Sequence, residues 1–193
     1  MLFDQKASAW VLQAKSMVLD VGPFEFEPSQ LQFINPALVM MLVPFTTGVL
    51  YPALERRRFS FTPVRRMTVG MFMAGLSFVL VALIQIALDR GVRLSVAWQL
   101  VPYIALTIGE VLVSVTGLEF AYSQAPREMK GTIMSFWLLT TAAGNLVVAV
   151  VARLNVFSGA ASFLFYAALV SLAGVGLGLV GRRHVNTEFF REG

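Results

Sequence analysis

The chain contains no cysteine and a single histidine, His184, among its 193 residues. Without cysteine, thiol catalysis, disulfide bonds and cysteine-based metal sites are excluded, and one histidine leaves few ligands for a catalytic metal. Charge is also scarce, since 13% of the residues are charged against roughly 25% in an average soluble domain. The net charge of +4 does not indicate nucleic-acid binding, because no basic stripe is interleaved with aromatic residues.

Long apolar runs are the dominant feature of what is present, and 57% of the residues are hydrophobic. A hydrocarbon core about 30 Å thick is crossed by about 20 helical residues, and helix is the only option for such runs because lipid satisfies no backbone hydrogen bonds. The predicted fold class is therefore an all-α polytopic membrane protein, with one membrane domain over residues 1–193. The predicted transmembrane helices are residues 30–54, 63–88, 96–125, 129–152 and 158–181.

The first segment, residues 1–17, reads MLFDQKASAWVLQAKSM and is too short and polar to span a membrane alone. It is either the end of a helix, and so a partial helix, or an amphipathic helix on the membrane surface, and the pattern leaves both open. Residues 18–29 follow as the longest connection, and their Gly22, Pro23 and Pro28 predict an irregular loop.

The distribution of Lys and Arg over the joints predicts the orientation, because cytoplasmic loops carry the excess of positive charge. The joints on one side hold Arg56, Arg57, Arg58, Arg65, Arg66, Arg127, Lys130, Arg182, Arg183 and Arg191, and those on the other hold Arg90, Arg93 and Arg153. This bias predicts a cytoplasmic C-terminus.

Glu110 stands near the middle of the predicted span 96–125. A charged carboxylate at the bilayer centre costs at least about 2.5 kcal/mol on insertion scales, so it must face protein or water, pair with a cation or carry a proton. A basic partner would come from another bundle or from the substrate. A functional group is the favoured interpretation, and a permanently protonated Glu that hydrogen-bonds within the bundle is the alternative.

Two other spans carry polar residues at depth. In the span 129–152, Trp137, Thr141, Gly144 and Asn145 share one helical stripe, where Trp137 either walls a cavity or fills a packing interface. In the span 30–54, Asn35 precedes Pro36, and its amide would serve equally as a ligand group or as a hydrogen bond between helices.

These residues carry a family resemblance. The segments LFDQKASAWVLQA, NPALVMMLVPF, GEVLVSVTGLEFAYSQAPREMKG and FWLLTTAAGN resemble, in order, the second half of a proton-coupled oligopeptide transporter of the POT or PTR family, in the major facilitator superfamily. The short joint DRGVRLS resembles bacterial members, which implies a multi-pass protein of the cell (inner) membrane. The implied fold is the C-terminal six-helix bundle with a truncated first helix, and residues 1–17 would be the end of the family's helix seven.

The resemblance implies symport of di- and tripeptides with protons, with no cofactor. By matching the family's motifs, Glu110 would contact the peptide amino end and take part in proton coupling, and Asn35 would contact the same amino group. Trp137 would line the pocket with Thr141 one turn further, and Asp4 would be the acidic residue of the outer gate.

The family's N-terminal six-helix bundle, with its lysine in helix four and its E-x-x-E-R proton site, has no counterpart in this sequence. The resemblance therefore implies a C-terminal half that needs a missing N-terminal bundle and is not active alone. One other interpretation stays open, an orphan bundle that acts only as an interaction module in the lipid bilayer. A pair of identical halves is disfavoured, because it would bring two Glu110 residues together with no lysine between them. An intramembrane enzyme is not expected, because the sequence has no paired carboxylates at depth and no nucleophile next to a base.

Overall fold

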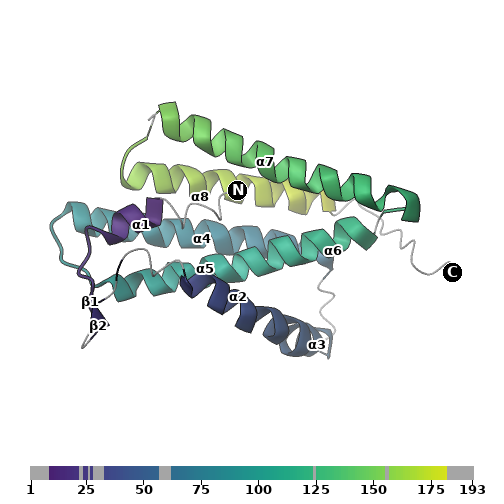
Figure 1. Cartoon of the computed structure of the whole chain (residues 1–193), viewed down its shortest axis with the longest axis horizontal. Coiled ribbons are helices and arrows are strands. Elements are labelled where there is room, and N and C mark those ends of the chain that lie inside the picture. Colours follow the sequence, from purple (N-terminus) through teal and green to yellow (C-terminus); the bar gives the residue numbers. More distant parts are fainter. Residues whose placement is uncertain are drawn as a thin grey trace.

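The computed structural model describes residues 9–21, 24–25, 27, 33–56, 62–123, 125–154 and 157–181. Its α-helices run side by side as a bundle, and a two-stranded hairpin lies at one end (Figure 1). The helices are α1 Ala9–Ala14, α2 Ile34–Phe45, α3 Tyr51–Arg56, α4 Pro63–Asp89, α5 Leu100–Glu110, α6 Thr116–Ser123, α7 Lys130–Leu154 and α8 Ala160–Gly181, and the strands are β1 Asp20–Val21 and β2 Phe24–Glu25.

Two of the membrane-length helices are composite. The π-helical segment Thr46–Leu50 joins α2 to α3, and a second π-helical segment, Val111–Val115, joins α5 to α6. The helices long and apolar enough to cross a membrane are Ile34–Ala53, Pro63–Asp89, Val96–Ser123, Lys130–Val151 and Ala160–Gly181. The predicted all-α polytopic fold class is confirmed, and the helices begin and end within a few residues of the apolar runs.

The first π-helical segment follows Pro44, which lies inside α2. Proline has no backbone N–H and its ring clashes with the preceding turn, so the regular hydrogen-bond ladder is interrupted there. The hydroxyls of Thr46 and Thr47 each donate to the Val43 carbonyl, at 2.9 Å in both cases. These hydroxyls add hydrogen bonds to the carbonyl of the residue before Pro44, where the regular α-helix changes into the π-helical segment.

The connection predicted as an irregular loop contains regular pairing. β1 and β2 pair antiparallel with Asp20 opposite Glu25 and Val21 opposite Phe24. Just before β1, Val18 accepts from the Val96 N–H and donates to the Leu94 carbonyl, both at 2.9 Å. This connection is thereby tied to the beginning of the Val96–Ser123 helix, and the prediction of a wholly irregular segment was wrong.

α4 lies at the centre of the bundle, with α8 along one side and α5 along another (Figure 1). Small residues bring α4 and α8 together: a Cβ added at Gly174 would lie 3.1 Å from Met71 Cβ, and one at Gly178 would lie 3.4 Å from Thr68 Cγ2. The G-x-x-x-G pattern of α8 is therefore a helix-packing surface, as such patterns in membrane helices often are.

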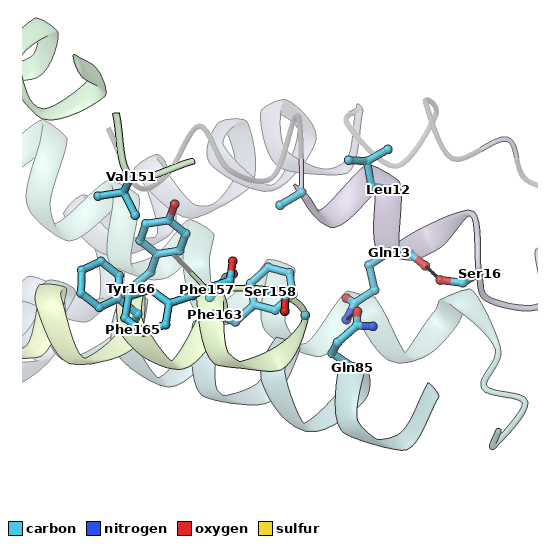
Figure 2. Close-up of a pocket in the computed structure, with 13 residues that line it drawn as sticks. Leu12, Gln13, Ser16, Gln85, Val151, Phe157, Ser158, Phe163, Phe165 and Tyr166 are labelled. Carbon is cyan, nitrogen blue, oxygen red and sulfur yellow. Dashed lines mark hydrogen bonds between the residues drawn. The ribbon is translucent and has the colours of Figure 1, made fainter. Parts of the chain in front are cut away.

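The short helix α1 is inserted into this bundle rather than laid on its surface. Its residues Trp10, Gln13 and Ala14 are buried, and Gln13 of α1 reaches toward Gln85 of α4 (Figure 2). Gln13 Nε2 donates to the Val81 carbonyl at 3.1 Å and to Gln85 Oε1 at 3.0 Å. The alternative of an amphipathic surface helix is therefore wrong for residues 9–14. Asp4 lies outside the described residues.

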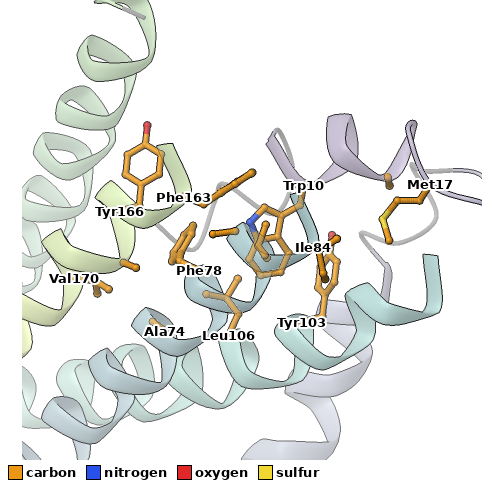
Figure 3. Packing of buried hydrophobic residues seen from close by; sticks show 14 of the residues in the cluster. Trp10, Met17, Ala74, Phe78, Ile84, Tyr103, Leu106, Phe163, Tyr166 and Val170 are labelled. Atoms are coloured by element: carbon orange, nitrogen blue, oxygen red, sulfur yellow. The ribbon is translucent and has the colours of Figure 1, made fainter. Parts of the chain in front are cut away.

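Trp10 sits in the middle of the largest buried cluster, beside Phe78, Leu106 and Tyr103 (Figure 3). Its indole ring is fully buried and meets Tyr103 and Phe78 edge to face, with ring centroids 4.9 Å and 6.0 Å apart. Such aromatic pairs contribute about 0.5–1.5 kcal/mol beyond the area they bury. This aromatic cluster fastens α1, α4 and α5 to one another.

Candidate functional site

The candidate site is centred on the end of α5, whose position is set by two glycines. A Cβ added at Gly109 would lie 2.7 Å from the Gly70 carbonyl oxygen and 3.0 Å from the Ala74 backbone nitrogen of α4. Because only hydrogen fits on the Gly109 Cα, the backbones of α4 and α5 approach each other directly at this point. The next residue along α5 is Glu110, so this crossing fixes the height and rotation at which the carboxylate leaves the helix.

Glu110 is the last residue of α5, and the π-helical segment Val111–Val115 begins immediately after it. It lies near the middle of the helix Val96–Ser123, and its side chain is half-buried. Single π-helical turns within α-helices are rare and occur frequently at functional sites. The unusual backbone geometry therefore begins directly after Glu110, the residue that stands out in the sequence by its charge.

Asn35 of α2 is brought to the same helix. The hydroxyl oxygen of Thr107 lies 2.9 Å from Oδ1 of the Asn35 side-chain amide, within hydrogen-bonding distance. Thr107 precedes Glu110 by three residues, and residues three apart share a face of an α-helix. Asn35 and Glu110 are thus gathered on one face of α5, although 75 positions separate them in the sequence numbering.

Thr107 was not among the residues that the sequence analysis singled out. It is fully buried, and its hydroxyl also lies 2.8 Å from the carbonyl oxygen of Tyr103, one turn earlier. Its position three residues before Glu110 could have identified Thr107 from the sequence as a neighbour of the carboxylate on the same helix face. The partner that gives it significance, Asn35, comes from another span and is not visible in the local pattern.

Trp137 of α7 contacts the same membrane-length helix further along, at Gly117. Its indole ring rests on Gly117 of α6, about two helical turns after Glu110, and the ring atoms Cζ3 and Cζ2 would lie 3.0 Å and 3.1 Å from a Cβ at that glycine. The ring is half-buried. Trp137 is therefore fixed against the helix that carries Glu110.

Thr141 is placed differently. It is exposed on α7, and its hydroxyl donates to the Trp137 carbonyl of its own helix at 3.3 Å. The described side chains of α7 are at most half-buried, including Asn145 on the same stripe. On this stripe Thr141 and Asn145 are therefore exposed, whereas Trp137 and Gly144 are half-buried.

A cavity of about 460 Å³ lies elsewhere, between α1, α4 and the beginning of α8. Figure 2 shows Gln13 and Gln85 at one side of it and the aromatic residues Phe163 and Tyr166 at the other. Of the predicted site residues that the structure describes, none lines this cavity. Among all the residues that the structure describes, no three His, Cys, Asp or Glu side chains come close enough to hold a metal ion.

The structure is a bundle of membrane-length helices with a carboxylate at mid-span, a buried amide, and a tryptophan ring packed against a neighbouring helix. These features define a multi-pass membrane protein with a polar site within the membrane-spanning region. Comparison with known proteins makes the assignment specific. The family model described as "PTR2: POT family" matches residues 1–162. The chain belongs to the POT family.

Individual relatives agree with this assignment. The chain is 34% identical to mouse solute carrier family 15 member 1 over 135 residues, which are 70% of this chain and 19% of that protein. An auto-inhibited POT family peptide transporter of known crystal structure is 45% identical, with a TM-score of 0.88 over 100% of this chain and 40% of that one. A crystal structure of peptide transporter POT in complex with alafosfalin shares the fold, with a TM-score of 0.79 over 94% of this chain and 37% of that one, at 24% identity.

The chain spans less than half the length of these proteins. The predicted family is confirmed, as is the prediction that the protein is not an enzyme, because the matched family consists of peptide transporters. The chain is a multi-pass membrane protein by the same comparison.

Proposed function

We propose that this chain supplies the C-terminal half of the substrate pathway in a proton-coupled symporter of di- and tripeptides. The observation that carries the proposal is the placement of Glu110 at mid-span with Asn35 held on the same face of its helix through Thr107. An ionisable residue at such depth is expensive and is a functional-site hypothesis by default. Similarity to POT family peptide transporters supports a peptide as the substrate class.

Glu110 is proposed to have two roles, as ligand for the peptide's amino terminus and as the group that couples the peptide to the proton. A positively charged group that comes close to a carboxylate favours its ionised form, and the departure of that group favours protonation. Arrival of the peptide ammonium would thus favour release of a proton, and its departure would favour uptake of one. Protons are the coupling ion in this scheme, and no cofactor is invoked.

The other predicted residues complete the proposed pathway. Asn35 would bind the same amino group, while Trp137 and Thr141 would form the wall of the pocket on the α7 side. Asp4 would act at the outer gate. Thr141 is already exposed on α7, where it is available to a ligand or to a partner bundle.

We also propose that the partner is an N-terminal six-helix bundle, which would supply the lysine for Glu110 and the groups for the peptide carboxylate. Transporters of this kind place the substrate between two bundles related by a repeat. The exposed side chains of Thr141 and Asn145 on α7 fit a surface that a second bundle would cover. The proposed location is the cell (inner) membrane, on the basis of the resemblance to bacterial members. The positive charges of the joints support a C-terminus in the cytoplasm.

The test is uptake of a radiolabelled dipeptide into proteoliposomes with an acid-outside gradient. One preparation holds this chain alone, and the other holds it with a separately produced N-terminal six-helix bundle of the family. We expect concentrative, saturable uptake only when both are present, with co-purification as the control that the two associate. Uptake by this chain alone would contradict the need for a partner. An associated pair that takes up no peptide would favour the orphan interaction module.

A further inference from the structure

Thr107 has a hydrogen-bonding problem that determines how Asn35 is oriented. Its hydroxyl oxygen lies 2.8 Å from the Tyr103 carbonyl oxygen and 2.9 Å from the amide oxygen Oδ1 of Asn35. Thr107 is fully buried and Asn35 is 7% exposed. Water is therefore a poor substitute for either of these partners, and both short contacts must be satisfied by the groups themselves.

The number of available hydrogens leaves one arrangement that satisfies both contacts. A hydroxyl carries a single hydrogen and a backbone carbonyl carries none, so the Thr107 hydroxyl must donate to Tyr103 if that contact is a hydrogen bond. Toward Asn35 the hydroxyl then has only a lone pair to offer. The amide must meet it with Nδ2, because two oxygens 2.9 Å apart without a hydrogen between them would repel each other. The two ends of an amide are assigned from such networks, and this network requires the Asn35 amide to be turned over, so that Nδ2 and not Oδ1 faces Thr107.

We infer that Thr107 is a positioning residue whose hydroxyl sets the polarity of the Asn35 amide. With the nitrogen committed to Thr107, the carbonyl oxygen Oδ1 faces the opposite way as an acceptor. Glu110, on the Thr107 face of α5, supplies carboxylate oxygens, which also accept hydrogen bonds. A site made of two acceptors selects a ligand that has several N–H donors and a positive charge, and a primary ammonium group fits this description.

This inference deepens the proposed function and rests on it for the identity of the ligand, but not for the orientation of the amide. A matched pair of variants separates the hydroxyl from the space it fills. Thr107→Val keeps the shape of the side chain and removes both the donor and the acceptor. Thr107→Ser keeps the hydroxyl, which in a helix also bonds to the carbonyl four residues earlier.

The first experiment measures the orientation in the chain itself, reconstituted in lipid. Solid-state NMR of protein labelled with ¹⁵N in the Asn side chains and ¹³C at Thr Cβ gives the dipolar coupling between Asn35 Nδ2 and Thr107 Cβ. We expect a strong coupling, and Thr107→Val assigns it by removing the signal. A weak coupling in the wild-type chain would mean that Oδ1 faces Thr107, and the inference would be overturned whatever the chain transports.

The second experiment uses the two-bundle preparation and compares a dipeptide with its N-acetylated form as competitors for uptake. We expect Thr107→Val to weaken the apparent affinity for the free-amino peptide by about tenfold or more, the scale of one hydrogen bond to a charged group. The apparent affinity for the N-acetylated peptide is expected to change by less than about twofold. Thr107→Ser is expected to behave like the wild type. Equal weakening of both peptides by Thr107→Val would show a merely structural role. Failure of the wild-type pair to take up peptide would instead count against the proposed function, and the NMR coupling would still decide the inference.

Discussion

The contact between Trp137 and Gly117 predicts how Gly117→Ala changes the free energy of unfolding. The sign of this change is expected to depend on whether the Trp137 ring is present. A Cβ added at Gly117 would overlap the indole ring of Trp137, and the ring atoms Cζ3 and Cζ2 would lie 3.0 Å and 3.1 Å from it. An indole ring is rigid and cannot fold out of the way as a flexible side chain would. Gly117→Ala must therefore displace the ring and, with it, α7 from α6.

The expected magnitude follows from two opposing terms. Overpacking of a tight contact costs about 1–3 kcal/mol, whereas replacing Gly by Ala within a helix gains up to about 1 kcal/mol. In the wild-type chain we expect Gly117→Ala to lower the free energy of unfolding, because the overlap outweighs the helix preference. In a Trp137→Ala background the overlap is gone, and the same substitution should be neutral or stabilising.

The assay is equilibrium unfolding in mixed detergent micelles, followed by far-UV circular dichroism, for the four members of this double-mutant cycle. We expect a coupling free energy of about 1–3 kcal/mol, within the range found for residues in contact. Gly176→Ala is the matched control, because a Cβ at that position would meet nothing within 4 Å. Additive effects of the two substitutions would refute the reasoning, since they would show that the ring does not rest on Gly117.

Two further glycines are expected to respond differently to the same substitution. Gly109→Ala should destabilise the chain by about 1–3 kcal/mol, because its Cβ would lie 2.7 Å from the Gly70 carbonyl oxygen and 3.0 Å from the Ala74 backbone nitrogen, and backbone atoms cannot give way alone. Gly178→Ala should change stability by less than about 0.5 kcal/mol, because its nearest neighbour, Thr68 Cγ2, would lie 3.4 Å away at ordinary contact distance. Both are measured by the same unfolding assay, and equal effects at the two positions would contradict the packing described for α4.

The helices could be predicted from the sequence because their signal is local. A run of about 20 apolar residues forms a helix in lipid whatever surrounds it, and the boundaries of the helices followed from the runs. The π-helical segment after Glu110 carries no comparable signal, since Val111–Val115 reads as ordinary apolar helix. Its wider turn becomes visible only in three dimensions.

The burial of α1 could not be predicted for a related reason. In the sequence, residues 1–17 fit a partial helix and a surface helix equally well, and what buries Trp10 and Gln13 is a set of distant partners. Gln99 Nε2 donates to the Trp10 carbonyl at 3.1 Å and to Gln13 Oε1 at 3.0 Å, across almost half of the chain. No periodicity within residues 1–17 contains that information.

The candidate site was predictable in part. Glu110 and Asn35 were identified as single residues, because a charge or an amide within an apolar run is conspicuous. The structure adds that Asn35 contacts Thr107, three residues before Glu110. The sequence pattern placed Trp137 and Thr141 on one stripe of a helix. It did not show that the Trp137 ring would pack against Gly117 of α6 while Thr141 stays exposed. The roles of these four residues and of Asp4 in peptide transport stay predictions.

The central claim is that Glu110 couples the movement of peptide to the movement of protons. The most direct test compares wild type with Glu110→Gln in the two-bundle preparation, measuring dipeptide accumulation under an acid-outside gradient and dipeptide exchange without a gradient. We predict that Glu110→Gln abolishes uphill accumulation and retains measurable exchange, because the amide can bind peptide but cannot carry the proton. Accumulation at the wild-type level by Glu110→Gln would contradict the coupling role.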